Sequence, residues 1–189
     1  MSRDAGGDDA RRRLIAVLRE HALIVGDVVL TSGASASYYV DAKRAILRPA
    51  GFSALGELVA RRAREVGATA VGGMTMGADP VACAALGAGL DAKAFFVRKE
   101  AKAHGLQRRV EGPPLEAQDR CLVVEDVVTT GASTVAAVQA LLEEGRHICG
   151  VLSVLDRQAG GAAAIEAAAD APYLALVSID DVYPERPDR

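Results

Sequence analysis

Residues 121–134 read CLVVEDVVTTGAST, and this stretch indicates how the chain folds. The continuous apolar run CLVV is typical of a strand that is buried on both faces of a sheet. The segment 132–144 is apolar and is predicted to be a helix. We therefore expect a strand over 120–125 that ends in Glu125 and Asp126, then a loop, then a helix. Strand, loop and helix in this order form the repeating unit of an α/β fold.

The same alternation of strands and helices continues on both sides of this segment. The expected strands cover 69–73, 92–97, 120–125, 148–155 and 173–178. The expected helices cover 49–66, 79–88, 132–144 and 161–169. Alternating strands and helices imply right-handed crossovers, and they predict a mostly parallel central sheet flanked by helices. Upstream, a helix over 10–24 and short strands over 28–30 and 37–41 predict a small N-terminal hood region over one end of the sheet.

The composition predicts a single domain over residues 1–189, with residues 1–9 as a flexible tail. The mass is 19.6 kDa, and 50% of the residues are hydrophobic, which is enough to bury a sizeable core. The net charge is −3, whereas a nucleic-acid binder is more often basic. The aromatic content is 4% without Trp, so no platform for stacking bases is available. We expect no nucleic-acid partner.

Three further features predict a cytoplasmic protein. No apolar run approaches the roughly 20 residues of a membrane helix, so we expect no membrane partner. The N-terminal stretch MSRDAGGDDARRR lacks the apolar region of a secretory signal. Cys83, Cys121 and Cys149 lack metal-site spacing and are expected to be small buried residues in a reducing compartment.

The loop TTGAST has the residues that a phosphate site needs. Ligands of parallel sheets bind beyond the carboxyl ends of the strands, where this loop stands. Its glycine allows close backbone approach, its hydroxyls can donate hydrogen bonds, and the free N–H groups of a helix start attract anions. The carboxylates of Glu125 and Asp126 beside it can accept hydrogen bonds from sugar hydroxyls. The pattern therefore indicates a ribose 5-phosphate, because GxxxxGK[ST] and GxGxxG are both absent. The alternative is an ordinary turn whose hydroxyl caps the helix.

The full pattern, an apolar strand followed by E-D-x-x-T-T-G-x-S-T, resembles the phosphoribosyl-pyrophosphate (PRPP) signature of the type I phosphoribosyltransferases. The resemblance implies the type I phosphoribosyltransferase fold, with Glu125 and Asp126 holding the ribose hydroxyls. It also implies Mg²⁺ that is carried in on PRPP, with no protein ligand to the metal directly assigned. The residues that the resemblance places around the 5′-phosphate are Thr129, Thr130, Gly131, Ala132 and Ser133.

The basic segment RKEAKAHGLQRR begins a stretch, residues 98–119, without a regular period. Loops of this length are usually lids, binding loops or disordered segments, and a basic lid suits a polyanionic ligand; the alternative is a solvated charge run. The spelling resembles the mobile catalytic loop of orotate phosphoribosyltransferases, which closes over the neighbouring subunit's site. It implies that Lys102 and His104 are catalytic and contact pyrophosphate, that Arg98 and Lys99 also bind it, and that the protein is a homodimer with shared active sites.

The segment VGGMTMGADP, residues 71–80, resembles the pyrophosphate loop of the same family. Its glycines after a strand allow close backbone approach to an anion. Many relatives carry a lysine in this loop, and Gly77 stands in its place here. Asp79, directly before Pro80, is expected to be the N-cap of the following helix.

Two segments resemble the orotate-binding parts of the family. Residues 28–47 read VVLTSGASASYYVDAKRAIL, and Thr31 replaces a lysine that many members have. We hypothesise that Lys43 or Arg44 supplies the missing charge. Tyr39, like the tyrosine before it, either packs on the planar base or belongs to the core.

The second segment is VLSVLDRQAGG, residues 151–161. The resemblance implies that Arg157 binds the carboxylate or carbonyl edge of orotate, for which a guanidinium is well shaped. The resemblance also places Thr129 at the base.

The sequence thus predicts an orotate phosphoribosyltransferase activity, which joins orotate to PRPP in pyrimidine synthesis and releases orotidine 5′-monophosphate and pyrophosphate. Two alternatives stay open. One is a phosphoribosyltransferase for another base that has the same PRPP site. The other is a non-catalytic regulator that senses PRPP.

Overall fold

The computed structural model describes residues 5–29, 35–100 and 109–189 of the chain. The helices are α1 (Ala5–His21), α2 (Lys43–Ile46), α3 (Pro49–Glu65), α4 (Asp79–Gly87), α5 (Ala132–Glu143), α6 (Gly161–Ala169) and α7 (Ile179–Val182). The strands are β1 (Leu23–Val29), β2 (Ser35–Val40), β3 (Ala70–Met74), β4 (Lys93–Val97), β5 (Val110–Glu111), β6 (Arg120–Val128), β7 (His147–Asp156) and β8 (Tyr173–Ser178).

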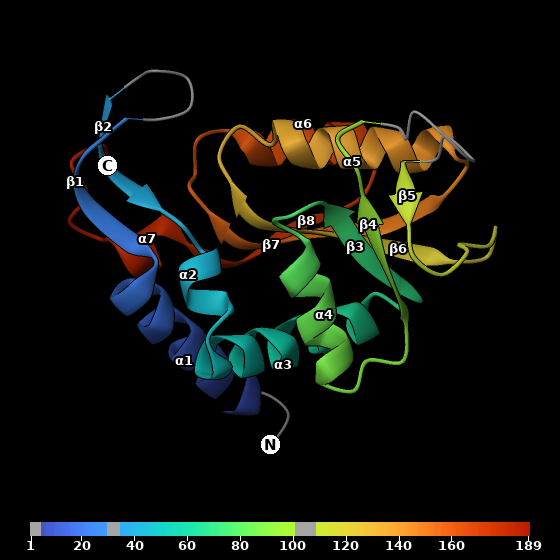
Figure 1. Cartoon of the computed structure of the whole chain (residues 1–189), viewed down its shortest axis with the longest axis horizontal. Coiled ribbons are helices and arrows are strands. Elements are labelled where there is room, and N and C mark those ends of the chain that lie inside the picture. The colour runs from blue at the N-terminus through green and yellow to red at the C-terminus, as the bar shows by residue number, and fades with distance from the viewer. Residues whose placement is uncertain (1–4, 30–34, 101–108) are drawn as a thin grey trace.

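The main sheet confirms the predicted parallel architecture. Its strand order is β5-β4-β3-β6-β7-β8, and every neighbouring pair is parallel except β4 and β5. Helices α1 to α4 lie on one side of this sheet, and α5 and α6 cover the other (Figure 1). The chain therefore has the layered α/β arrangement that alternating strands and helices predict.

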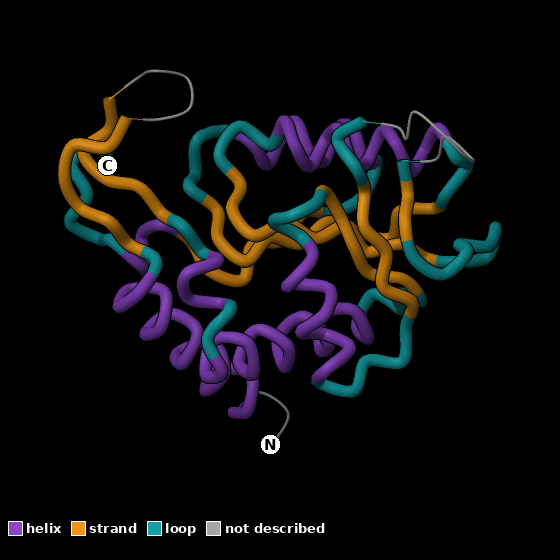
Figure 2. The backbone as a smooth tube through the Cα atoms, viewed as in Figure 1, coloured by secondary structure: helices purple, strands orange, loops and turns teal. Residues whose placement is uncertain are grey.

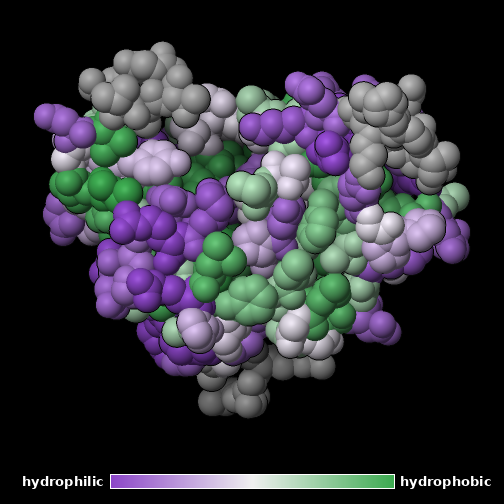
Figure 3. Space-filling view, viewed as in Figure 1, coloured by the Kyte–Doolittle hydropathy of each residue, from purple (hydrophilic) through white to green (hydrophobic). Residues whose placement is uncertain are grey.

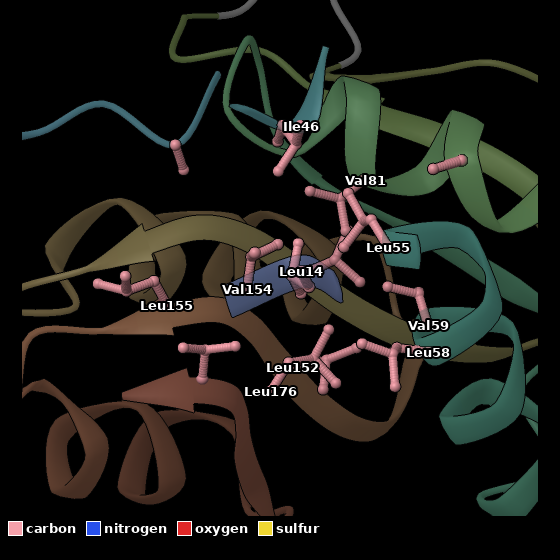
Figure 4. Close-up of a cluster of buried hydrophobic side chains, with 14 of the residues drawn as sticks. Leu14, Ile46, Leu55, Leu58, Val59, Val81, Leu152, Val154, Leu155 and Leu176 are labelled. Carbon is pink, nitrogen blue, oxygen red and sulfur yellow. The ribbon is translucent and has the colours of Figure 1, made fainter. Parts of the chain in front are cut away.

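Each face of the sheet has its own hydrophobic core. The alternation of side chains along β6 divides them, with Leu122 and Val124 in the core under α1 to α4 and Cys121 and Val123 in the core under α5 and α6. Figure 4 shows part of the first core, where leucines of α1 and α3 meet the side chains of β7 and β8. A leucine buried in such a cluster contributes about 1.5–3 kcal/mol relative to an exposed one.

The N-terminal hood region is a separate two-stranded sheet next to the main one. Strands β1 and β2 are antiparallel and pair from Leu23↔Val40 to Val29↔Ser35. They lie beside the carboxyl ends of β7 and β8, close to the C-terminus (Figure 2). The short helix α2 follows β2 directly and leads into α3. The hood therefore stands over the edge of the sheet at which ligands bind in such folds.

Several boundaries differ from the predictions. Helix α1 starts at Ala5, so most of the expected tail is helical, and Arg13 Nε pairs with Asp9 Oδ2 at 2.9 Å one turn away. The two-residue strand β5 lies inside the stretch that was expected to have no regular structure, and α2 and α7 were not predicted. The prediction of three buried cysteines is confirmed for Cys121 only, because Cys83 is exposed on α4 and Cys149 is half-buried.

Strand β6 is longer than expected, and this difference matters for function. It continues to Val128, because β7 remains paired with it up to Val128↔Asp156. Strand β3 pairs with β6 only as far as Gly72↔Val123. Glu125 and Asp126 therefore lie inside a strand, at the level where its neighbour β3 has already turned away.

No helix in the described part of the chain is both long and apolar enough to cross a membrane.

Candidate active site

The two acidic residues lie where the strand order of the sheet reverses. From β3 the chain adds β4 on one side, and from β6 it adds β7 on the other. The crevice at such a switch point is where open α/β sheets bind ligands. A β-carbon on Gly77, in the loop after β3, would lie 2.5 Å from Asp126 Oδ1 and 2.6 Å from Glu125 Oε1. The loop thus packs directly against the carboxylates, and a lysine at position 77 could not fit unless they moved.

The carboxylate pair is buried and unevenly neutralised. Glu125 and Asp126 are 5% and 7% exposed. Lys43 Nζ donates to Asp126 Oδ2 at 2.9 Å, whereas Glu125 accepts only neutral donors, from Thr134 Oγ1 at 3.3 Å and the Asp126 amide at 3.2 Å. Burial and the neighbouring Asp126 charge raise the pKa of Glu125 to about 8. The raised pKa favours the protonated form of Glu125, in which its hydroxyl group can donate as well as accept hydrogen bonds.

The phosphate loop surrounds a small cavity at the start of α5. The cavity has a volume of about 130 Å³ and is lined by the residues from Val127 to Thr134 together with Glu125. The N-cap position of α5 is Gly131, with φ 79°, so this position has no side chain to cap the helix. The first N–H groups of α5 are then free for an anion, as the phosphate prediction requires. All five residues predicted to hold the 5′-phosphate line this cavity.

A second cavity lies beside the first, under the hood. Its volume is about 180 Å³, and its lining residues are Tyr39, Val40, Lys43, Asp126, Val127, Thr129 and Arg157. Arg157 Nε is buried and has no hydrogen-bond partner among the described residues. Its guanidinium carbon lies 4.7 Å from the centre of the Tyr38 ring. The cavity thus presents two cations and one unused donor, which suits a small planar anion.

The structure decides two of the alternatives on the base side. Tyr38 is a core residue at 2% exposure, whereas Tyr39 is 37% exposed and lines the cavity. Lys43 lines the cavity as well, but Arg44 is exposed and is not among its lining residues. Lys43 is therefore the better candidate for the charge that replaces a lysine at Thr31. Thr31 itself lies outside the described residues.

The basic loop is only partly described. Lys102 and His104 lie outside the described residues, so their roles stay predictions. Arg98 is at the base of the β4–β5 hairpin, with its Nη1 3.7 Å from Glu111 Oε1, and Lys99 is exposed. The structure does not bring either of these two side chains to the cavities described above.

The expectation that Asp79 caps α4 was wrong. The helix begins at Asp79 itself, its N-cap position is Ala78, and no side chain makes a capping hydrogen bond there. Asp79 Oδ2 instead accepts a hydrogen bond of 2.7 Å from Thr75 Oγ1, four residues earlier. The carboxylate therefore secures the loop after β3, which explains why an acid precedes Pro80.

The described residues contain no group of three or more His, Cys, Asp or Glu side chains that could hold a metal ion. Glu125 and Asp126 are adjacent, and Lys43 already pairs with one of them. A cation here needs further ligands from a substrate, as Mg²⁺ often takes from phosphates.

Comparisons with known proteins agree with this geometry. An orotate phosphoribosyltransferase of Corynebacterium glutamicum is 45% identical over 183 residues, which cover 96% of this chain and 98% of that protein. The chain belongs to the orotate phosphoribosyltransferase family. A crystal structure of the Mycobacterium tuberculosis orotate phosphoribosyltransferase is similar with a TM-score of 0.83 and 41% identity, over 92% of this chain and 98% of that one.

A second structure of the M. tuberculosis orotate phosphoribosyltransferase, in complex with PRPP, matches over the same shares with a TM-score of 0.79 and 37% identity. No protein-family model matches the chain. The similarity to these solved structures confirms the fold prediction, which was the mostly parallel sheet of a type I phosphoribosyltransferase with its hood region.

Some site features of this family member were not predicted from the sequence. The packing of Gly77 against the carboxylates and the ion pair between Lys43 and Asp126 join segments that are far apart in the chain. The contact between the Arg157 guanidinium and the Tyr38 ring also joins two segments that are far apart in the chain. The local sequence signal next to Gly77 is A-D-P at 78–80. It marks the start of α4, and therefore the end of the loop that packs against the carboxylates.

Proposed function

We propose that the chain transfers the 5-phosphoribosyl group of PRPP to orotate, giving orotidine 5′-monophosphate and pyrophosphate in pyrimidine synthesis. The observation that carries this proposal is the adjacency of the two cavities, which share Thr129 and Val127 in their linings. One cavity offers free helix N–H groups for a phosphate, and the other offers the unused donor of Arg157. A ribosyl group that joins a phosphate to an anionic base would span both.

In this proposal each group has a defined task. Glu125 and Asp126 bind the ribose 2′ and 3′ hydroxyls, and residues 129–133 enclose the 5′-phosphate. Arg157 and Lys43 bind the anionic edge of orotate, while Tyr39 and Thr129 flank the ring. The reaction breaks the bond between ribose C1 and pyrophosphate and forms a bond from C1 to the orotate ring nitrogen, whose proton leaves to the departing pyrophosphate or to water. The protein accelerates it by aligning the two reactants and excluding water.

Departure of pyrophosphate needs positive charge that the described site does not supply on that side. Lys43 and Arg157 both line the base cavity. By family resemblance, Lys102 and His104 provide this charge as catalytic residues, and Arg98 and Lys99 add to pyrophosphate binding. When carried in on PRPP, Mg²⁺ would supply positive charge against the pyrophosphate, with no protein ligand to it assigned.

We also propose that the chain works as one catalytic domain and as a cytoplasmic homodimer whose sites are completed by the partner's basic loop. Hydrophobic surface gathers over α4, whereas the surface over α1 is hydrophilic (Figure 3). Leu47, after α2, and Met76, before α4, are 62% and 73% exposed. A gathering of exposed apolar side chains is the kind of surface that a second copy of the chain could cover.

The test is orotate consumption followed by absorbance, with PRPP and Mg²⁺ present or omitted, and with adenine, hypoxanthine and uracil in parallel. We expect turnover of orotate alone, because the guanidinium of Arg157 suits a carboxylate, which the other bases lack. Turnover of a different base would establish the phosphoribosyltransferase alternative. Tight PRPP binding without turnover of any base would establish the regulator.

A further inference from the structure

The segment 183–188, close to the C-terminus, packs against Tyr38, the neighbour of the cavity residue Tyr39. The Tyr183 ring meets the Tyr38 ring edge-on, with centroids 5.4 Å apart and an interplanar angle of 78°. The Tyr38 hydroxyl donates to Asp188 Oδ2 at 3.0 Å. Tyr38 is therefore held both at its ring and at its hydroxyl by residues from the opposite end of the chain.

A second connection runs from the same segment to the residue after Arg157. Arg186 forms ion pairs with Asp180 and with Asp188, the latter at 3.2 Å, and its side chain is 9% exposed. Its Nη2 also donates to Gln158 Oε1 at 3.4 Å. Gln158 has φ 56°, in the left-handed region, and its main-chain N–H donates to Asp156 Oδ1 at 2.7 Å. Arg186 thus links the segment to the turn that carries Arg157.

These contacts converge on the guanidinium of Arg157. The Arg157 amide is fixed by a 2.9 Å hydrogen bond to Val128 O, but four rotatable bonds separate the main chain from the guanidinium. The Tyr38 ring, 4.7 Å away, is the side chain on which that guanidinium rests. An arginine held over an aromatic face loses less conformational freedom when its ligand arrives.

We propose that residues 183–188 form a brace that holds Tyr38 under Arg157, so that Tyr38, Arg186 and Asp188 are positioning residues for base binding. This inference rests on the proposed function, in which Arg157 binds orotate. The brace reaches the base cavity only through Tyr38 and Arg157, and none of its residues lines the phosphate cavity. Loss of the brace therefore weakens orotate binding selectively.

Steady-state kinetics test the selectivity. Arg186→Gln and Asp188→Asn should each raise the KM for orotate by about three- to ten-fold, the range expected when one or two hydrogen bonds that fix a binding group are lost. The KM for PRPP should stay within about two-fold, because the phosphate loop is untouched. Arg62→Gln is the matched control, since Arg62 lies on α3 and pairs with Glu65, outside the brace. Equal increases in both KM values, or no change in either, would overturn the brace.

A measurement without substrate separates the brace from the proposed function. In a ¹H–¹⁵N spectrum of the ligand-free protein, the Arg157 Nε–H signal, assigned through Arg157→Lys, should carry a ring-current shift from Tyr38. Tyr38→Leu should abolish this shift, and Asp188→Asn should reduce it, while Arg62→Gln leaves it unchanged. A signal that does not move in Asp188→Asn overturns the brace even if orotate is turned over. A signal that moves in a protein that does not use orotate leaves the brace standing and removes only the proposed function.

Discussion

The proposed phosphate side of the site, residues 129–133, and the proposed base side, Tyr39, Lys43 and Arg157, are built in different ways. The phosphate side is one contiguous loop that offers main-chain N–H groups at the start of α5. The base side collects side chains from β2, α2 and the end of β7. A dianionic phosphate is common to many substrates, so a backbone cradle serves all of them. Selection among bases needs charged side chains that point in a defined direction. One substitution can remove such a side chain, whereas it leaves main-chain N–H groups in place.

Arg157 gives the strongest test of this division. Arg157→Ala should lower kcat/KM for orotate by ~10²–10³, because it removes the cation that we propose binds the substrate carboxylate. The dissociation constant of PRPP should change by no more than about two-fold. Both follow from steady-state kinetics and calorimetric titration. Arg157→Lys keeps the charge but loses the bidentate fork, so its kcat/KM for orotate should lie between the values of the wild type and Arg157→Ala. A comparable loss of PRPP affinity would break the division.

Gly131 tests the phosphate side. A β-carbon there would lie 2.9 Å from Ile165 Cγ1 and 3.0 Å from Gly161 O, and φ is 79°. Gly131→Ala should therefore shift the loop and raise the PRPP dissociation constant by ~10–100-fold, measured by calorimetry. Gly145→Ala is the control, because φ is 69° there and no atom lies within 4 Å of the added carbon. PRPP affinity that falls equally in both variants would show that general strain, and not loop shape, is responsible.

Lys43 sharpens the comparison because it lies between the two sides. Lys43→Ala should raise the KM for orotate by about ten-fold, equivalent to ~1.4 kcal/mol. The affinity for PRPP should change by less, through the loss of the ion pair with Asp126. Arg44→Ala, which removes an exposed charge next to it, should leave both constants unchanged. If neither variant alters the orotate KM, the charge that replaces a lysine at Thr31 comes from elsewhere.

Glu125 predicts an effect on stability and not on substrate binding. Its pKa is raised from 4.5 to about 8 by burial and by Asp126, so between these values the folded protein holds a proton that the unfolded chain has released. Stability should therefore fall, by about 3–4 kcal/mol for the full shift, as pH rises from about 5 to about 8, and then level off. Urea unfolding at several pH values should show a flatter profile for Glu125→Gln than for the wild type.

Glu65→Gln provides the control for that profile. The pKa of Glu65 is lowered by Arg62 and Arg61, so this carboxyl is charged in both states across the same pH range. The variant should keep the wild-type slope above about pH 5. A Glu125→Gln profile identical to that of Glu65→Gln would contradict the proposed protonation of Glu125.

Much of the fold and of the phosphate side could be predicted because their signals are local. The strand CLVV and the loop TTGAST are adjacent in the chain, so their order alone places a phosphate cradle at a helix start. The extent of β6 was misjudged because Glu125 and Asp126 are polar. The pairing of β7 with β6, a tertiary feature, keeps them in the strand. Asp79 was wrongly predicted to be the N-cap of α4. Its carboxylate accepts a hydrogen bond from Thr75, which precedes the helix, and not from an N–H group inside the helix.

The sequence by itself determined the parallel α/β sheet, the phosphate loop and the candidate residues of the base side, because periodicity and contiguous motifs act over a few residues. Only the tertiary structure decided that Tyr39 lines the cavity while Tyr38 supports Arg157, and that Lys43 and not Arg44 faces Asp126. It also brought Asp188 under Tyr38 from the other end of the chain. Such contacts depend on how the hood, β7 and the C-terminal segment pack together, and no spacing along the chain encodes that packing.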